Sequence, residues 1–509
     1  MAGRQSRGVI MVQGTSSHAG KSVLVAALCR IFAREGLRVA PFKAQNMSLN
    51  SYATRDGGEI GRSQAVQAAA AMVSPRVEMN PVLLKPEGES RSQVVVMGRP
   101  QAVASPREYH QLQSSIWEQV TAALDSLRSE YDLVVIEGAG SPAEINLKSR
   151  DIVNMRVALH AEAPVLLVGD IERGGVFAQL VGTMELLDHE ERAQVKGFVI
   201  NKFRGEPSLL DSGLDYLKGR TGVPVVGVLP YFRDIRIPEE DSLGLAGGDG
   251  GEDETAVDVA VIRLPHIANF DDFDPLRYEP GVRLRYVTRS AEFGDPDLVV
   301  IPGSKTTISD LDWLRTENID AKILAARADG TPVMGICAGY QMLGTRLEDP
   351  HRVESSRSEA EGLGLLPTST TFLREKATYQ TRVRVAAGRG LLSGCRETEA
   401  TAYEIHMGVT TGQATPMPFI IESRSSKRVE VPDGALDGEG LTLGTYLHGL
   451  FHNPQVRRSI LECAGRRRSL TLPDEGSEPD QNAEYDKLAD WACANLDMAY
   501  LRRIAGLPA

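Results

Sequence analysis

The sequence predicts an α/β protein with two doubly wound domains and a helical C-terminal extension. Three observations support this fold: short apolar runs alternate with amphipathic stretches, glycine-rich turns follow two of those runs, and an acidic, glycine-rich segment divides the chain. Apolar runs of this length are typical of strands that helices cover on both faces. A chain of 509 residues also exceeds the size of one hydrophobic core. We therefore place domains at 1–237 and 257–456, a linker at 238–256, and the extension at 457–509.

The order of the predicted elements favours parallel sheets. Two amphipathic stretches, 22–35 and 61–72, predict helices between strands of the first domain, and 483–504 predicts a helix pair in the extension. In doubly wound sheets, ligands bind beyond the carboxyl ends of the strands. The predicted strands are 8–12, 38–41, 133–136, 164–168, 197–200 and 224–228 in the first domain, then 257–264, 298–301 and 333–335 in the second.

The composition narrows the classes of partner. The net charge of −12 argues against nucleic acid as the main partner, because phosphate backbones need a basic surface. Five cysteines occur without a CxxC pair, so neither a zinc site nor a disulfide framework is predicted. No apolar run approaches the ~20 residues that span a bilayer, and we expect no signal peptide before the first strand. These features predict a cytoplasmic protein without a membrane partner.

A phosphate-binding loop is predicted where GTSSHAGKS joins the first strand to a helix. Backbone N–H groups of Gly14, Thr15 and Gly20 can surround phosphate oxygens. Lys21 can neutralise their charge, and the Ser22 hydroxyl can ligate Mg²⁺. The loop is one residue longer than the standard spacing. A glycine-rich turn that binds no nucleotide is the alternative, which the flanking strand and helix disfavour.

Charged residues at the ends of predicted strands are candidates for a metal or substrate site. Glu137 follows an apolar strand and opens the sequence EGAG, where a carboxylate beside a phosphate loop can ligate Mg²⁺. A solvated acid at a strand end is the alternative for Glu137. Asp170 ends another strand and could serve Mg²⁺ or a substrate. Lys43 and Asp151 are candidates only because of their positions along the chain.

A second candidate site combines a cysteine with a distant histidine. Cys337 lies in a strand-to-helix turn of the kind that exposes a nucleophile and directs the next N–H, that of Ala338, at an oxyanion. His448 follows another apolar run, and an imidazolium is the usual partner of a reactive thiolate. Gly303 could supply a second oxyanion donor. An inert buried cysteine is the alternative, and His406 is the rival of His448.

Several stretches resemble known families. The phosphate loop with EGAG resembles the dethiobiotin synthetase-like fold, which activates carboxylates with ATP, and GICAGYQ with His448 resembles a class I glutamine amidotransferase domain. Their fusion in this order resembles the cobyric acid synthase family from about residue 8 to the end. The supporting phrases are PFKAQNM, EGAGSPAEINL, DIERGGVF, NKFRG, LPHIANFDDFDPL, IPGSK and YEIHMG.

The resemblance implies glutamine-dependent amidation of a corrinoid in cobalamin biosynthesis. ATP would phosphorylate the b, d, e and g carboxylates of adenosylcobyrinic acid a,c-diamide in turn, and ammonia from L-glutamine would displace each phosphate to give adenosylcobyric acid. Cys337 would form the γ-glutamyl thioester, with His448 as base and then acid. Gln341 would help to hold glutamine.

In the synthetase half, the resemblance implies ATP and Mg²⁺ as cofactors. Lys21 and Ser22 would bind the phosphates and the metal, and Glu137 would be a further metal ligand. Asn201 would lie at the adenine. Lys43 and Asp151 would face the activated carboxylate of the substrate.

Two departures from the resembled families affect these roles. Class I amidotransferases usually carry His-x-Glu, whereas Leu450 occupies the Glu position here, so a Cys–His dyad is implied. The dethiobiotin synthetases place a metal-binding Asp on the helix after the second strand, where this chain has Arg62, Ser63 and Gln64. The third Mg²⁺ ligand therefore stays open.

The sequence leaves two other functions open. The chain could amidate another substrate with several carboxylates, or it could be a P-loop ATPase whose amidotransferase domain serves only as a scaffold. Intact Cys337 and His448 argue against the scaffold. If both sites are active, we expect ammonia to pass between the domains without leaving the protein. The sequence does not predict the oligomeric state.

Overall fold

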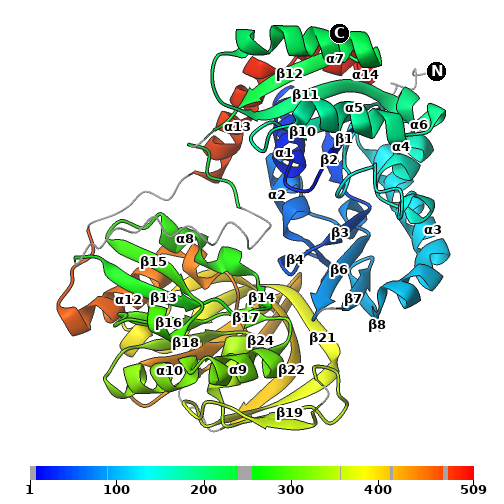
Figure 1. The fold of residues 1–509 in the computed structure, drawn as a ribbon. Helices are drawn as coiled ribbons and strands as arrows, with labels where there is room; N and C mark the ends of the chain where they lie inside the picture. The colour runs from blue at the N-terminus through cyan, green and yellow to red at the C-terminus, as the bar shows by residue number, and fades with distance from the viewer. Residues whose placement is uncertain are drawn as a thin grey trace.

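A computed structural model describes residues 7–88, 90–232, 234–238, 255–355, 357–412, 417–473 and 480–508. These residues form two α/β lobes, which follow one another along the chain and lie against each other (Figure 1). Each lobe contains a six-stranded sheet with mainly parallel pairing, so the predicted fold of two doubly wound domains is confirmed. Most of the predicted linker, 239–254, lies outside the described residues.

The first lobe is built on a parallel sheet with the order β2-β9-β1-β10-β11-β12. Its strands are buried because helices pack on both faces, with α1 on one side and α3, α4 and α5 on the other. The strands are β1 (Gly8–Gly14), β2 (Val39–Phe42), β9 (Leu133–Glu137), β10 (Val165–Asp170), β11 (Val195–Phe203) and β12 (Val225–Pro230). The helices are α1 (Lys21–Arg34), α2 (Arg62–Ala70), α3 (Pro106–Glu130), α4 (Met155–Ala161), α5 (Val176–Leu186), α6 (His189–Gln194) and α7 (Asp211–Thr221).

The register of this sheet gathers polar residues at one edge. β9 ends at Glu137, which pairs with Val12 just before the phosphate loop. β10 ends at Asp170, which pairs with Asn201 of β11. Parallel strands bring their carboxyl ends to the same edge, so these side chains and the loop after β1 share one end of the lobe.

Two small sheets extend from the first lobe toward the second (Figure 1). They were not predicted, because their strands are short and only partly apolar. One has the order β3-β6-β7-β8, with β3 (Gln45–Met47), β6 (Val82–Glu87), β7 (Arg91–Val96) and β8 (Arg99–Ala104). The other pairs β4 (Ser51–Ala53) with β5 (Glu59–Gly61), and β4 contacts strands β21 and β22 of the second lobe.

The second lobe contains a sheet with the order β15-β13-β16-β18-β26-β25 and a separate, mainly antiparallel sheet formed around β21. The first comprises β13 (Val257–Ile262), β15 (Val282–Val287), β16 (Leu298–Ile301), β18 (Val333–Ile336), β25 (Ala435–Leu436) and β26 (Thr442–Thr445). The second comprises β19 (Arg346–Glu348), β20 (Glu359–Glu361), β21 (Thr368–Val385), β22 (Glu399–Gly412), β23 (Phe419–Arg424) and β24 (Lys427–Asp433). β14 (Ile267–Ala268) pairs with β17 (Gly303–Ser304), and the helices are α8 (Asp274–Arg277), α9 (Thr307–Thr316), α10 (Ile319–Ala328) and α11 (Ala338–Leu343).

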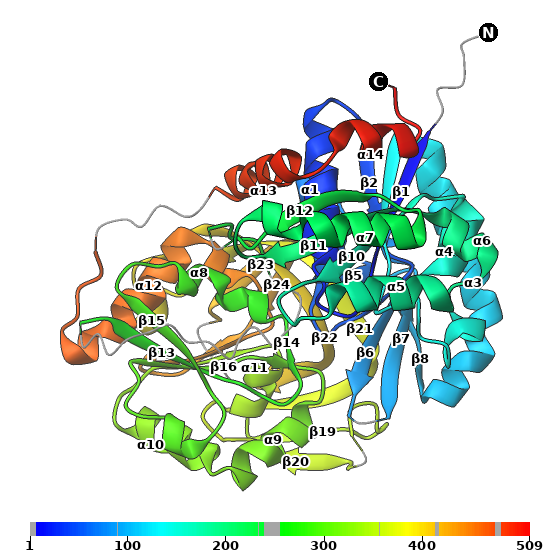
Figure 2. The same ribbon diagram turned by 45° about the horizontal axis from the view of Figure 1, so that its top comes forward.

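The segment predicted as one C-terminal extension divides between the lobes. Helix α12 (Pro454–Gly465) packs into the core of the second lobe. Helices α13 (Gln481–Asn495) and α14 (Met498–Ile504) return to the first lobe and pack beside α1 (Figure 2). The last two helices therefore lie in the same lobe as the first strand. Among the described residues, no helix is long and apolar enough to cross a membrane.

The packing of α13 predicts that it stabilises the first lobe. Leu488 is fully buried in the core that α13 shares with α1. Leu488→Ala should lower the free energy of unfolding by about 2–5 kcal/mol, because it removes buried methyl groups and leaves a cavity. Urea unfolding measures this change. Leu209→Ala is the control, since Leu209 is 76% exposed, and equal losses in both variants would contradict the packing role.

Candidate active site

The predicted phosphate loop turns between β1 and α1 at the carboxyl edge of the first sheet. Gly20 has a φ of 97°, a conformation that favours glycine. A Cβ at this position would lie 2.0 Å from Asn201 Nδ2. Lys21 Nζ donates to the carbonyl oxygens of Ser16 at 2.9 Å and Gly140 at 3.1 Å. Lys21 therefore joins the loop to the segment after β9.

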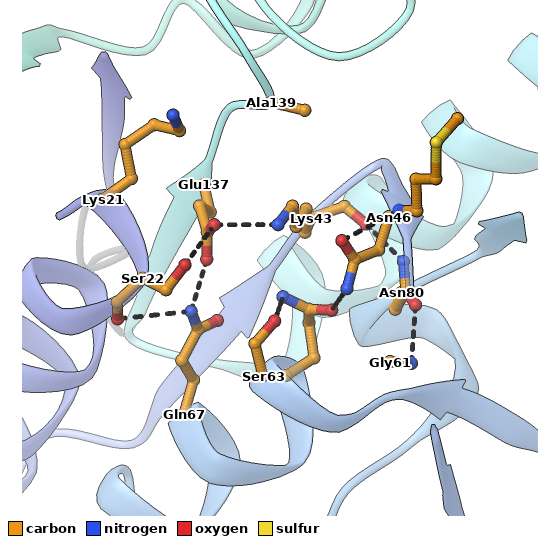
Figure 3. A network of polar contacts seen from close by, with 12 residues as sticks. Lys21, Ser22, Lys43, Asn46, Gly61, Ser63, Gln67, Asn80, Glu137 and Ala139 are labelled. Carbon is orange, nitrogen blue, oxygen red and sulfur yellow. Dashed lines mark hydrogen bonds and ion pairs between the residues drawn. The ribbon is translucent and has the colours of Figure 1, made fainter. Parts of the chain in front are cut away.

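Glu137 is the buried centre of a polar network beside this loop (Figure 3). Its carboxylate accepts hydrogen bonds from Ser22 Oγ at 2.8 Å, from Lys43 Nζ at 2.9 Å and from Gln67 Nε2. Burial opposes ionisation, but the Lys43 ammonium and the hydrogen bonds outweigh it and hold the pKa of Glu137 below its usual range. The hydroxyl of Ser22 and an ionised carboxylate are oxygen ligands of the kind that Mg²⁺ takes.

Gln67 is a member of this network that the sequence did not predict. It lies on the buried face of α2, about one turn beyond Arg62, Ser63 and Gln64, where the related synthetases carry a metal-binding Asp. Gln64 points elsewhere, accepting from Asn46 Nδ2 at 3.1 Å and donating to Ser63 Oγ at 2.7 Å. The available signal was the helical period of α2, which places Gln67 one turn after Ser63 on the same face of the helix.

The other predicted residues of this lobe lie nearby with partners of their own. Thr15 Oγ1 donates to Gln179 Oε1 at 3.0 Å. Asn201 Nδ2 donates to the carbonyl oxygen of Ala19 at 2.9 Å and so supports the loop. Asp151 accepts from three backbone N–H groups that lead into α4, while burial raises the pKa of its carboxyl group. Lys43 therefore lies in an ion pair with Glu137, whereas Asp151 accepts hydrogen bonds at the start of α4.

A large cavity opens beside the loop. It has a volume of about 670 Å³, and its lining includes Ser17, Gly140 and Asp151. The small sheet supplies the opposite wall, including Met47 of β3. Met47 and Leu147, both in the lining, are 58% and 50% exposed. Two large apolar side chains therefore face solvent where a ligand could cover them.

A second cavity, of about 620 Å³, lies at the ends of β11 and β12. Phe203 and Tyr231 line it, together with Trp491 from α13. The Arg204 guanidinium lies 3.7 Å from the centre of the Tyr231 ring. Flat aromatic and guanidinium faces of this kind can stack on a planar ligand.

In the second lobe, Cys337 occupies a strained turn between β18 and α11. Its φ of 53° and ψ of −107° place a non-glycine residue in a sparsely populated conformation. Gly339 makes the turn possible, because a Cβ there would lie 1.9 Å from the carbonyl oxygen of Ile301. The turn therefore has the backbone strain typical of a nucleophile elbow.

His448 and Cys337 line one cavity of about 50 Å³, and a carboxylate orients the histidine. Asp272 Oδ2 lies 2.7 Å from His448 Nδ1, and Asp272 Oδ1 accepts from the Gly449 N–H at 2.7 Å. Burial opposes the imidazolium, but Asp272 and then Cys337 outweigh it and raise the pKa of His448 to about 10. The dyad implied by Leu450 is therefore wrong, because Asp272 supplies the carboxylate from another part of the chain.

Sequence reasoning missed the role of Asp272, although the phrase that contains it was noted. Asp272 lies 176 residues from His448, and no local pattern links the two. The available signal was a pair of acids, Asp271 and Asp272, between two phenylalanines. Such a pair can be buried only with partners.

The predicted glutamine and oxyanion residues surround the thiol. Gln341 lines the cavity, accepting from Thr307 Oγ1 at 3.1 Å and donating to the carbonyl oxygen of Met407 at 2.9 Å. Gly303 also lines the cavity. Ala338 begins α11 directly after Cys337. These positions are compatible with the predicted roles.

Further ionisable residues line the same cavity, among them His406 and Glu354. His406, the rival histidine, stacks on Tyr446 at 3.8 Å, and its Nε2 lies 3.6 Å from Glu404, so its carboxylate contact is looser than that of His448. Glu354 was not predicted. Burial raises the pKa of Glu354 to about 7, and its carboxylate accepts from the Thr307 N–H.

The fold and the two sites together define a nucleotide-dependent enzyme that also carries a glutaminase-type thiol site. Residues 258–456 match the model of the CobB/CobQ-like glutamine amidotransferase domain, and residues 10–244 match the CobQ/CobB/MinD/ParA nucleotide binding domain. The chain is 52% identical to a cobyric acid synthase of Sorangium cellulosum, with 98% of each chain covered. It is 50% identical to a cobyric acid synthase of Moorella thermoacetica, over 98% of this chain and 97% of the relative. The chain therefore belongs to the cobyric acid synthase family, whose members are glutamine-hydrolysing ligases.

The contact between Asp272 and His448 predicts a strong effect on glutamine hydrolysis. Asp272→Asn should lower kcat roughly 10²- to 10⁴-fold, because the imidazole loses its orientation and the charge that stabilises its protonated form. Since Asp272 raises the pKa of His448, the basic limb of the pH profile of kcat/KM should move to lower pH. Glutamate release across the pH range measures both effects.

The control for this variant is Asp125→Asn. Asp125 lies 3.3 Å from His160 in an exposed pair of the first lobe. That exchange should leave glutamine hydrolysis unchanged. A basic limb that stays in place in Asp272→Asn would show that Asp272 does not set the protonation of His448.

Proposed function

We propose that this enzyme amidates the b, d, e and g carboxylates of adenosylcobyrinic acid a,c-diamide with ATP and L-glutamine, giving adenosylcobyric acid. Its similarity to cobyric acid synthases over nearly the whole chain supports the substrate. The observation that carries the chemistry is the pairing of an oriented Cys337–His448–Asp272 site with a phosphate loop beside a cavity of about 670 Å³. One site supplies ammonia, and the other activates the carboxylate.

At the synthetase site, a substrate carboxylate is a poor electrophile until its oxygen becomes a good leaving group. A carboxylate oxygen attacks the γ-phosphorus of ATP, and the bond to the β-phosphate oxygen breaks to release ADP. Ammonia then attacks the acyl phosphate, and phosphate leaves as the amide forms and a proton is lost. Lys21 neutralises phosphate charge, and Asp151 and Lys43 face the carboxylate.

The polar network around Glu137 fits a magnesium site. The described residues include no group of three or more His, Cys, Asp or Glu side chains that could hold a metal alone. Mg²⁺ commonly takes one or two protein ligands and completes its shell with phosphate oxygens and water. Ser22 and Glu137 would hold it here, where it would neutralise the charge of the transferring phosphate. Adenine would lie beyond Asn201, toward the aromatic cavity at the ends of β11 and β12.

At the thiol site, Cys337 Sγ attacks the side-chain carbonyl carbon of glutamine. His448 takes the thiol proton and delivers it to the leaving nitrogen, so the C–N bond breaks and ammonia departs. The N–H groups of Gly303 and Ala338 stabilise the oxyanion. Water activated by His448 then cleaves the thioester and releases glutamate. Asp272 holds the imidazole in the orientation that both steps need.

The small sheet of the first lobe lies between the two cavities, which supports direct transfer of ammonia. Lys85 of β6 and Gln93 of β7 line the Cys337 cavity. Their neighbours Leu84, Pro86 and Val94 line the large cavity. Successive residues of a strand point to opposite faces, so one layer of β-structure separates the sites.

Mass spectrometry of the corrinoid tests the proposed reaction. Adenosylcobyrinic acid a,c-diamide incubated with the enzyme, ATP, Mg²⁺ and glutamine should show four successive mass losses of about one unit, because each amidation replaces OH by NH₂. An added ammonia trap should leave this series intact. Glutamine hydrolysis and ATP cleavage without a mass change would overturn the proposed substrate.

Cys337 variants distinguish this function from that of an ATPase with a scaffold domain. Cys337→Ala should abolish glutamate release because no nucleophile remains, and a wild-type rate would support the scaffold. Cys337→Ser should lose amidation with glutamine but regain it with free ammonium, because the synthetase site is chemically separate. Ammonium-dependent amidation by the same preparation also shows that the first lobe is intact.

A further inference from the structure

The carboxylate that orients His448 lies on a segment of the second lobe that the first lobe holds in place. This segment is Asn269–Asp272. The Ser51 N–H donates to Asn269 Oδ1 at 3.0 Å, and the Phe270 N–H donates to Asn50 Oδ1 at 3.2 Å. Both partners are loop or strand residues near β4 of the first lobe. The position of Asp272 therefore depends on how the lobes are docked.

Arg62, the first residue of α2, adds a charged contact to the same segment. Its Nη2 lies 2.9 Å from Asp271 Oδ2, and the two side chains are 15% and 1% exposed. Asp271 and Asp272 are adjacent acids in a buried site, where like charges repel strongly. Arg62 offsets this repulsion, and its removal would leave the Asp271 carboxylate as an uncompensated buried charge.

A column of aromatic rings connects Arg62 with His448, the histidine that Asp272 orients. The guanidinium lies 5.5 Å from the centre of the Tyr52 ring, whose own centre is 6.4 Å from that of Tyr403. Tyr403 stacks on His448 at 5.0 Å and exchanges two backbone hydrogen bonds with it, at 3.1 and 2.9 Å. Arg62 is therefore linked to both members of the catalytic pair, to Asp272 through the neighbouring Asp271 and to His448 through two tyrosine rings.

We propose that Arg62, a residue of the synthetase lobe, is a positioning residue of the glutaminase site. By pairing with Asp271 it keeps Asp272 within hydrogen-bonding reach of His448, so the thiol site is complete only when the lobes are docked. The proposal rests on the proposed function for glutamine hydrolysis alone and needs no corrinoid. Arg62 is absent from the lining of the Cys337 cavity, so its loss slows the chemical steps without weakening glutamine binding.

Steady-state glutamine hydrolysis by the full chain tests this proposal. Arg62→Gln should lower kcat about ten- to hundredfold with KM changed less than about twofold, because displacing catalytic groups by about 1 Å can slow a reaction by that much. Arg62→Lys keeps the positive charge and should recover most of the lost kcat. This separation of kcat from KM, with rescue by lysine, is not expected of a general loss of structure.

The matched control makes the same exchange elsewhere in the first lobe. Arg76→Gln breaks ion pairs with Glu78 and Glu130, at 3.1 and 2.6 Å, and neither partner belongs to the second lobe. It should leave kcat for glutamine unchanged. An equal loss of kcat in Arg62→Gln and Arg76→Gln would overturn the proposal, as would a wild-type kcat in Arg62→Gln.

A double variant tests whether Arg62 acts through Asp271. Adding Asp271→Asn to Arg62→Gln removes the uncompensated charge, so it should restore part of the lost kcat and show non-additive coupling. A further independent loss would contradict the pairing. If Arg62→Gln fails to fold, Arg62→Lys and the double variant still decide. Normal glutamine hydrolysis without corrinoid amidation in the wild-type enzyme would overturn the proposed substrate and leave this proposal standing.

Discussion

The buried carboxylate of Glu137 is the constraint on which the nucleotide side of the molecule depends. An ionised carboxylate without partners costs several kcal/mol in a protein interior. Glu137 draws its partners from three separate elements: Ser22 of α1, Lys43 after β2 and Gln67 of α2. The phosphate loop, the second strand and α2 are therefore positioned together, and a metal ion would enter a site whose oxygen ligands are already oriented.

Helix α2 extends this constraint to the second lobe. Its nine residues span roughly 13 Å, with Gln67 at the nucleotide site and Arg62 beside Asp271. Two residues of one short helix, five positions apart, thus contact the acid of the synthetase site and the segment that holds the acid of the glutaminase site. The lobes are therefore linked through helix α2 as well as through the surface between them.

The small sheet β3-β6-β7-β8 explains how two chemistries can lie close together without sharing a cavity. Alternation along β6 directs Lys85 toward the thiol and its neighbours Leu84 and Pro86 toward the carboxylate site. A parallel strand of the central sheets could not do this, because helices cover both of its faces. These strands are partly polar, and for that reason the sequence did not predict them. The same partly polar character allows them to face two cavities.

The sequence by itself determined the two doubly wound sheets, the phosphate loop and the cysteine turn. Each depends on neighbouring residues: apolar runs form buried strands, and glycines such as Gly20 and Gly339 permit backbone that other residues resist. Only the tertiary structure decided that Asp272 orients His448, that Gln67 binds Glu137 and that the extension divides between the lobes. These contacts join residues far apart in the chain, and burial of charge selects such partners by their position in space and not by their spacing in sequence.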